Sequence, residues 1–177
     1  NLLVLQMSRK MQEGFEPLRN DLLNNPQVER VTKSLQGPWH IGSTVSAVDW
    51  KGKAPDEKVS MHWDYVGYDY FSTLKMNIIE GRAFSREFPT DPREAYIVNE
   101  EAVKLMGMES PAGKPLSVFR NQGQIIGVVK NFHFQPLTHD IKPFVFMLRP
   151  DSGSLVFIRI RPENIPTTLG NIRTLLA

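Results

Sequence analysis

A strict alternation of side chains between residues 59 and 65 constrains the fold of this chain more than any other feature. Val59, Met61, Trp63 and Tyr65 alternate with polar residues. A period of two is typical of a β-strand with one face on the core and the other in solvent. We therefore expect a sheet whose core carries these aromatic side chains, with His62 and Asp64 on a solvated face.

Both ends of the chain predict strands and amphipathic helices. An apolar run at 2–6 is followed by a helix with its apolar face at 15–23, a stop at Asn24-Asn25-Pro26 and a second strand at 28–35. This is a β-α-β unit, whose crossover should be right-handed. Strands at 144–148 and 155–160, joined across 151–153, lead into a final helix that starts near Pro166.

The middle of the chain predicts mostly strands. We expect them at 45–50, 59–65, 76–79, 96–98, 116–119 and 124–129. Asp69 is a candidate cap for a short helix at 70–74, and Asn99 for a helix at 100–106 that stops at Gly107.

These patterns predict an α+β fold with two subdomains. An α/β subdomain is built from both chain ends, residues 1–82 and 145–177, as a split β-α-β plus β-α. A strand-rich subdomain, residues 83–144, is inserted into it. Because both ends belong to one subdomain, the two termini should lie side by side and point the same way.

Composition excludes several classes. The chain has 177 residues, a net charge of +2 and no cysteine, so disulfides and cysteine-based chemistry are excluded. Lysine and arginine are scattered, whereas nucleic-acid binding normally needs a basic face. No apolar run is long enough to cross a bilayer. The chain opens on an apolar strand without an initiator methionine and stops inside a helix, so we expect an excised piece of a longer protein.

The residues predict no enzyme. His133, His139 and Asp140 match no standard zinc spacing, and His62 with Asp64 lacks the oriented third group that a general base needs. We predict no catalytic residue, no metal site and no cofactor. Aromatic and basic residues remain as a candidate partner or ligand surface, although packing in the core is the alternative for the aromatics. The candidates are Tyr68, Tyr70, Lys130, Phe132, His133 and Phe134.

A series of short motifs runs through nearly the whole chain in order and resembles one family. The motifs are Asn25-Pro26-x-Val28-x-x-Val31, Val66-x-x-Asp69-Tyr70-Phe71-x-x-Leu74-x-Met76, Glu80-Gly81-Arg82-x-Phe84, Val98-Asn99-Glu100-x-Ala102, Pro111-x-Gly113-Lys114-x-Leu116 and Ile126-Gly127-Val128-Val129-Lys130-Asn131-Phe132-His133-Phe134. With these motifs the chain is similar to the MacB-like periplasmic core domain of bacterial ABC transporter permeases of the FtsX-like group, in a variant most like that of Bacteroidetes-type bacteria.

The resemblance implies a porter-like subdomain from the chain ends and a sabre-like inserted lobe, in the periplasmic portion of an inner-membrane protein. One membrane helix would precede this domain and three would follow it. The implied function is non-catalytic: the domain couples cytoplasmic ATP hydrolysis to periplasmic conformational change in an export or efflux system. The alternative is a periplasmic ligand- or peptide-binding or sensing module of the same permease. Expected partners are a second permease copy, a separate ATPase subunit and a periplasmic adaptor or lipoprotein.

Overall fold

The computed structural model describes residues 1–39, 41–134 and 140–176. Its strands are β1 (Leu2–Gln6), β2 (Val28–Ser34), β3 (Thr44–Val45), β4 (Val48–Trp50), β5 (Met61–Val66), β6 (Ile78–Gly81), β7 (Ala95–Asn99), β8 (Pro115–Val118), β9 (Asn121–Val129), β10 (Phe144–Leu148) and β11 (Leu155–Ile160). Its helices are α1 (Arg9–Glu13), α2 (Phe15–Leu23), α3 (Tyr70–Leu74), α4 (Asp91–Glu94), α5 (Glu100–Met106) and α6 (Ile165–Leu176).

The strands of the described residues form one large mixed sheet. Its order is β1-β11-β2-β5-β10-β7-β9-β8-β4, with β3 paired to β5 and β6 paired to β9. Strand β10 lies parallel to β5 and antiparallel to β7, so the sheet mixes both kinds of pairing. The predicted α+β class is therefore confirmed as a mixed fold around a single sheet.

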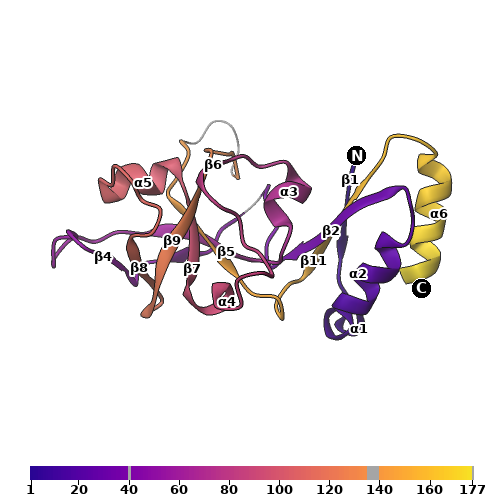
Figure 1. Ribbon diagram of the computed structural model, residues 1–177, viewed down its shortest axis with the longest axis horizontal. Coiled ribbons are helices and arrows are strands. Elements are labelled where there is room, and N and C mark those ends of the chain that lie inside the picture. The colour runs from indigo at the N-terminus through magenta and orange to yellow at the C-terminus, as the bar shows by residue number, and fades with distance from the viewer. Residues whose placement is uncertain (40, 135–139, 177) are drawn as a thin grey trace.

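The molecule is elongated and has two lobes (Figure 1). The terminal lobe, residues 1–34 and 154–176, contains β1, β2 and β11 with α1, α2 and α6. Helices α2 and α6 contribute Phe15, Leu22 and Ile172 to a core that also contains Val31 and Ile158 from the sheet. The central lobe, residues 35–153, contains the other strands and helices.

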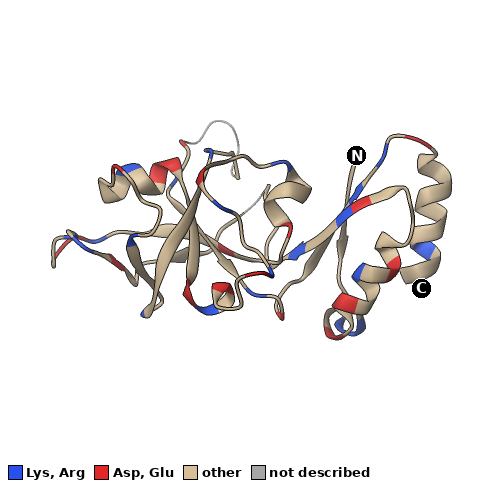
Figure 2. Cartoon of the chain, in the orientation of Figure 1, with Lys and Arg blue, Asp and Glu red and all other residues tan. Residues whose placement is uncertain are grey.

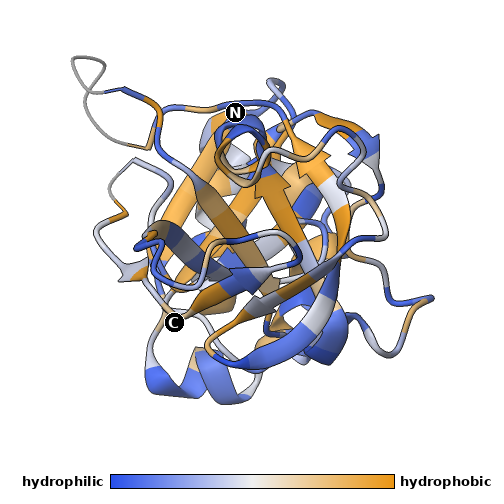
Figure 3. Ribbon diagram, turned by 90° about the vertical axis from the view of Figure 1, so that its left-hand side faces the viewer, coloured by the Kyte–Doolittle hydropathy of each residue, from blue (hydrophilic) through white to orange (hydrophobic). Residues whose placement is uncertain are grey.

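The core of the central lobe lies on both faces of the sheet. One face packs Met61, Val98, Leu116 and Met147 together with neighbouring apolar residues. The other face carries an aromatic cluster of Tyr70, Phe71, Phe84, Phe132, Phe134, Phe144, Phe146 and Phe157. Seen from the end of this lobe, apolar strands occupy the interior and polar helices and loops surround them (Figure 3).

The sheet crosses the subdomain boundaries predicted from the sequence. Strand β4, which lies in the predicted terminal subdomain, pairs with β8 of the predicted inserted subdomain, and the boundary at 144/145 falls inside β10. Strands β10 and β11 are not a hairpin, because β10 pairs with β5 and β7 while β11 pairs with β1 and β2. Joined strands need not be neighbours when other strands compete for the same edge.

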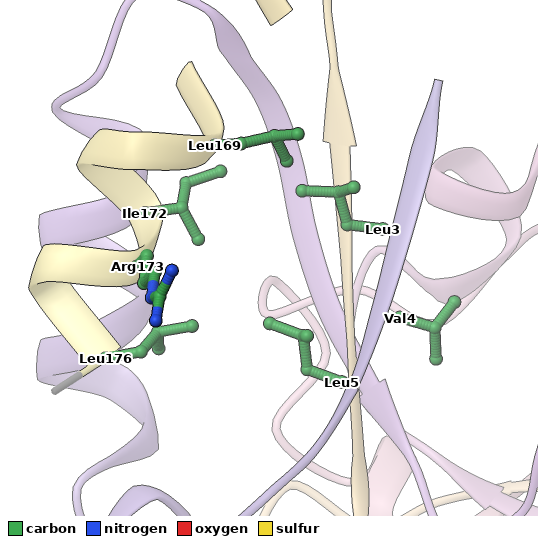
Figure 4. Close-up of a pocket in the computed structure, with 7 residues that line it drawn as sticks. All are labelled: Leu3, Val4, Leu5, Leu169, Ile172, Arg173 and Leu176. Carbon is green, nitrogen blue, oxygen red and sulfur yellow. The ribbon is translucent and has the colours of Figure 1, made fainter. Parts of the chain in front are cut away.

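The chain termini lie in the same lobe, but not as the sequence predicted. Strand β1 and helix α6 run side by side in the same direction (Figures 1 and 4). The amino group of Asn1 donates to the Ile160 carbonyl at 3.1 Å. Residue 1 therefore lies beside the beginning of α6, whereas the last described residue lies at the other end of that helix. The expectation that both ends point the same way is wrong.

Candidate functional site

Two of the six residues predicted to form a partner or ligand surface lie in the core. Tyr70 is 1% exposed and Phe134 is 2% exposed. The Tyr70 ring lies 5.8 Å from that of Phe146, and the Phe134 ring lies 5.0 Å from that of Phe144. The expectation that Tyr70 is exposed is wrong, because helix α3 turns this side chain onto the aromatic cluster.

The other four candidates differ in how far they are exposed. Phe132 is half-buried against Phe144 and Phe146, with ring centroids 5.3 and 5.5 Å apart. Tyr68 is half-buried beneath the Arg86 guanidinium, 4.3 Å from the ring centroid. Lys130 and His133 are exposed. A binding role for these residues stays a prediction.

Asp64 is fully buried, so the expectation of a solvated face around it is wrong. The sheet is covered on both sides, and the face that carries Asp64 and Val66 packs against the aromatic cluster. The Gln36 backbone N–H donates to Asp64 Oδ1 at 3.0 Å, and Oδ2 has no partner among the described residues. Loss of hydration disfavours the charged form and raises the pKa of Asp64 to about 8.

The candidates for acid–base or metal chemistry that lie within the described residues have different environments. His62 is half-buried with its ring 4.9 Å from that of Phe134, and desolvation lowers its pKa. His133 is exposed, and His139 lies outside the described residues. Among the residues that the structure describes, no group of three histidine or carboxylate side chains could hold a metal ion.

Motif residues that carry the family resemblance hold loops of the central lobe in place. Asn99 caps α5 by accepting from the Ala102 N–H at 3.0 Å, and it also accepts from the Phe144 N–H at 2.8 Å. Arg82 donates two bonds, of 2.7 and 2.8 Å, to the buried carboxylate of Asp91. Through these contacts, Asn99 and Arg82 hold neighbouring segments of the central lobe together.

Polar contacts tie the two lobes together where they meet. Asp69, just before α3, accepts from Arg19 of α2 at 3.1 Å and from Arg86 at 3.0 Å. The Thr32 hydroxyl of β2 donates to the Tyr68 carbonyl at 2.6 Å. The sequence predicts Asp69 as the cap of α3, but its side chain makes no capping bond and bridges the lobes instead. The lobes are therefore joined by side chains as well as by the sheet.

An apolar groove lies in the terminal lobe, between β1 and α6. Its volume is about 500 Å³, and α6 presents Leu169, Ile172 and Leu176 towards Leu3 and Leu5 of β1 (Figure 4). Arg173 is the one charged residue of α6 and lies at the groove. No signal in the sequence indicates a groove, because apolar runs in a strand and a helix normally predict a filled core.

Charge is distributed without a dominant face. Basic and acidic residues alternate along both lobes, and α6 is almost free of them (Figure 2). No described helix is both long and apolar enough to traverse a lipid bilayer.

Comparisons with known proteins agree on one kind of domain. No family model matches the sequence. The macrolide export ATP-binding/permease protein MacB of Bartonella quintana (strain Toulouse) is 25% identical over 83 residues, which are 45% of this chain and 13% of that protein. The chain thus spans only a small fraction of the curated relative that it matches.

Solved structures match almost the whole chain. The periplasmic region of MacB from Actinobacillus actinomycetemcomitans superposes with a TM-score of 0.67 at 14% identity, over 99% of this chain and 81% of that one. The extracellular domain of the noncanonic ABC-type transporter YknZ from Gram-positive bacteria superposes with a TM-score of 0.65 at 18% identity, over 99% of this chain and 92% of that one. A domain of a putative permease from Porphyromonas gingivalis superposes with a TM-score of 0.59 at 13% identity, over 90% of this chain and 69% of that one.

The fold is therefore that of the extracytoplasmic domains of ABC-type permeases. In fold this chain is a MacB-like periplasmic domain, and the recognition made from the sequence motifs is confirmed at that level.

Proposed function

We propose that this chain is the periplasmic domain of an inner-membrane ABC transporter permease of the MacB/FtsX type, with no catalytic activity of its own. The observation that carries the proposal is the match of 99% of the chain to the MacB periplasmic region. The local sequence match to a second MacB supports it independently of the fold. The buried positions of Asp64 and Tyr70 fit a structural role better than a catalytic one.

The proposed role is to transmit movement. A separate ATPase subunit on the cytoplasmic side hydrolyses ATP, and the membrane helices pass the resulting displacement to this domain. A well-packed body with a continuous sheet moves as a unit, because close-packed interiors transmit strain. The contacts of Asp69 with Arg19 and Arg86 support this role by bracing one lobe against the other.

The proposal extends to organisation and partners. The terminal lobe corresponds to a porter-like subdomain and the central lobe to a sabre-like one, so we place the division near residues 34 and 154 in place of 82 and 145. Strand pairing supports this shift, because β4 pairs with β8 and β5 pairs with β10, and all four strands lie in the central lobe. A second permease copy, the ATPase subunit and a periplasmic adaptor or lipoprotein are the proposed partners.

The topology can be tested by labelling single cysteines, because the chain contains none. Lys51→Cys and Lys104→Cys place a thiol at exposed positions of the central lobe. In spheroplasts that express the full-length permease, a membrane-impermeant maleimide should label both positions. Labelling that appears only after lysis would place the domain on the cytoplasmic side and would refute the proposal.

A peptide- or ligand-binding module is the second candidate function. The groove between β1 and α6 favours it, because concave apolar sites are the usual seats of small ligands. This candidate moves the proposed site away from Tyr68 and Phe132 to the terminal lobe. It requires the groove to be open in the natural polypeptide.

A further inference from the structure

Strand β1 leaves one edge of the large sheet unpaired within the described residues. It is the first strand in the sheet order and pairs only with β11. Asn1 exchanges two backbone hydrogen bonds with Ile160, and the Met7 N–H donates to the Ser154 carbonyl. The backbone N–H and C=O groups of the odd-numbered residues therefore point towards β11. In an antiparallel pair the alternate residues point outward, so the N–H and C=O groups of Leu2, Val4 and Gln6 face away from the sheet.

The same edge borders the apolar groove. Leu3 and Leu5 are only half-buried, and Leu169 is 40% exposed on the opposite wall. An edge with free backbone groups next to partly exposed leucines is a template for another strand. A strand added here would satisfy the outward groups and place every second side chain between β1 and α6.

The topology of the terminal lobe indicates where such a strand comes from. The connection from β1 to β2 crosses β11 with α2 on one face, and α6 packs on that same face. Strand β11 runs opposite to β1. A second right-handed connection that leaves β11 through α6 must therefore cross the sheet in the direction opposite to that of the connection from β1 to β2. It passes over β1 and reaches the free edge, since parallel crossovers are right-handed almost without exception.

The completed arrangement would be two interlocked β-α-β units, the split pattern of ferredoxin-like folds. In Figure 4, α6 descends beside β1 and brings Leu176 opposite Leu5. A short turn after α6 would place the following residues at the edge.

We propose that the groove between β1 and α6 is the seat of a further β-strand of the same polypeptide, following α6 and running antiparallel to β1. This strand has apolar residues at alternate positions facing Leu3, Leu5 and Ile172. An acidic residue near its α6 side would meet Arg173. The strand separates α6 from whatever follows in sequence, so α6 would not lead directly into a membrane helix.

Hydrogen exchange of single amides tests the proposal without reference to transport. The amide of Val4 is measured in chain 1–177 and in the same polypeptide extended past residue 177 along its natural sequence. We expect fast exchange in the shorter chain and exchange slower by about tenfold or more in the longer one, because a new backbone bond protects this amide. Leu3 and Leu5, which face β11, are internal controls that stay protected in both.

Substitutions at the edge provide a second readout. Val4→Pro removes the outward N–H, whereas Val4→Ala removes only side-chain volume. We expect Val4→Pro to lower the Tm of the extended polypeptide more than Val4→Ala does, and the two to have similar effects in chain 1–177. Equal effects in both polypeptides, or unchanged Val4 exchange, would overturn the proposal. Protection that instead rises with the concentration of chain 1–177 would identify a second copy as the occupant and also refute it.

Discussion

Asp64 is the residue whose environment departs furthest from what its chemistry prefers. Its carboxyl group is fully buried on the aromatic side of β5 and accepts a hydrogen bond from the Gln36 N–H. Its position next to Ser34 and Gln36 places it close to the junction of the lobes. Burial of a charge without a countercharge costs stability, so we expect the group to be protonated in the folded protein up to a pKa of about 8.

The first prediction concerns Asp64→Asn, which imitates the protonated carboxyl group. Between about pH 4 and 8 the unfolded chain releases this proton while the folded chain keeps it, so the parent loses stability as pH rises. The stability advantage of the variant should therefore grow with pH, by up to about 1.4 kcal/mol per pH unit. Urea unfolding at pH 4.5, 6.0 and 7.5 measures it.

Asp49→Asn is the matched control, because Asp49 is exposed on β4. It should alter the free energy of unfolding little at any of the three pH values. If the free energies of unfolding of Asp64→Asn and the parent differ by the same amount at all three pH values, Asp64 is charged in the folded state and the prediction is wrong.

At the scale of elements, two glycines differ sharply in what surrounds them. Gly81 ends β6 with φ of +70°, and a Cβ there would lie 2.1 Å from the Ile126 carbonyl oxygen. Gly170 lies in α6, is exposed, and a Cβ there would meet nothing within 4 Å. Gly81 allows β6 to approach β9 closely, whereas Gly170 lowers the helix propensity of α6.

Gly81→Ala and Gly170→Ala should therefore have opposite effects. We expect Gly81→Ala to lower the free energy of unfolding by roughly 2–4 kcal/mol, through the clash and the positive φ. Gly170→Ala should raise it by about 0.5–1 kcal/mol, because alanine favours the helix. Thermal and urea unfolding of both variants measure the effects. Destabilisation by Gly170→Ala would mean that this face of α6 is covered more closely than the structure shows.

Most elements could be predicted because their signals are local. The Asn99 cap and the Gly107 stop define α5, and both occur in the structure. Helix α1 could not be predicted, because its five residues are too few to show a helical period. The pairing of β10 could not be predicted either, because strand partners are chosen across the whole sheet. The prediction for Asp64 is wrong because alternation indicates which side chains share a face, but not whether that face is covered. The prediction for Tyr70 is wrong because the position of a side chain on the short helix α3 does not indicate which face of that helix packs on the core.

At the scale of the whole molecule, the two lobes share one sheet, and β11 of the terminal lobe contributes Phe157 to the aromatic cluster of the central lobe. The register between β2 and β5 contains one residue pair, Ser34 and Val66. Backbone bonds from the Leu35 N–H to the Tyr65 carbonyl and from the Gly67 N–H to the Lys33 carbonyl flank this pair. Side-chain contacts add to this joint through Asp69, Arg19 and Arg86. Partly exposed ion pairs are individually weak, so we expect stiffness to come mainly from the packed sheet and from Tyr70 and Phe157, whose rings lie 6.0 Å apart.

The most direct test of this account measures distances in the assembled permease. Spin labels at Lys10→Cys in the terminal lobe and Lys51→Cys in the central lobe report on one copy, and single labels at position 51 report on the spacing of two copies. Pulsed electron resonance in membranes containing the ATPase subunit compares both distances with and without ATP. We predict that the distance between copies shifts while the distance between lobes does not. A spacing unchanged by ATP under active hydrolysis, or lobes that move relative to each other as much as the copies do, would contradict it.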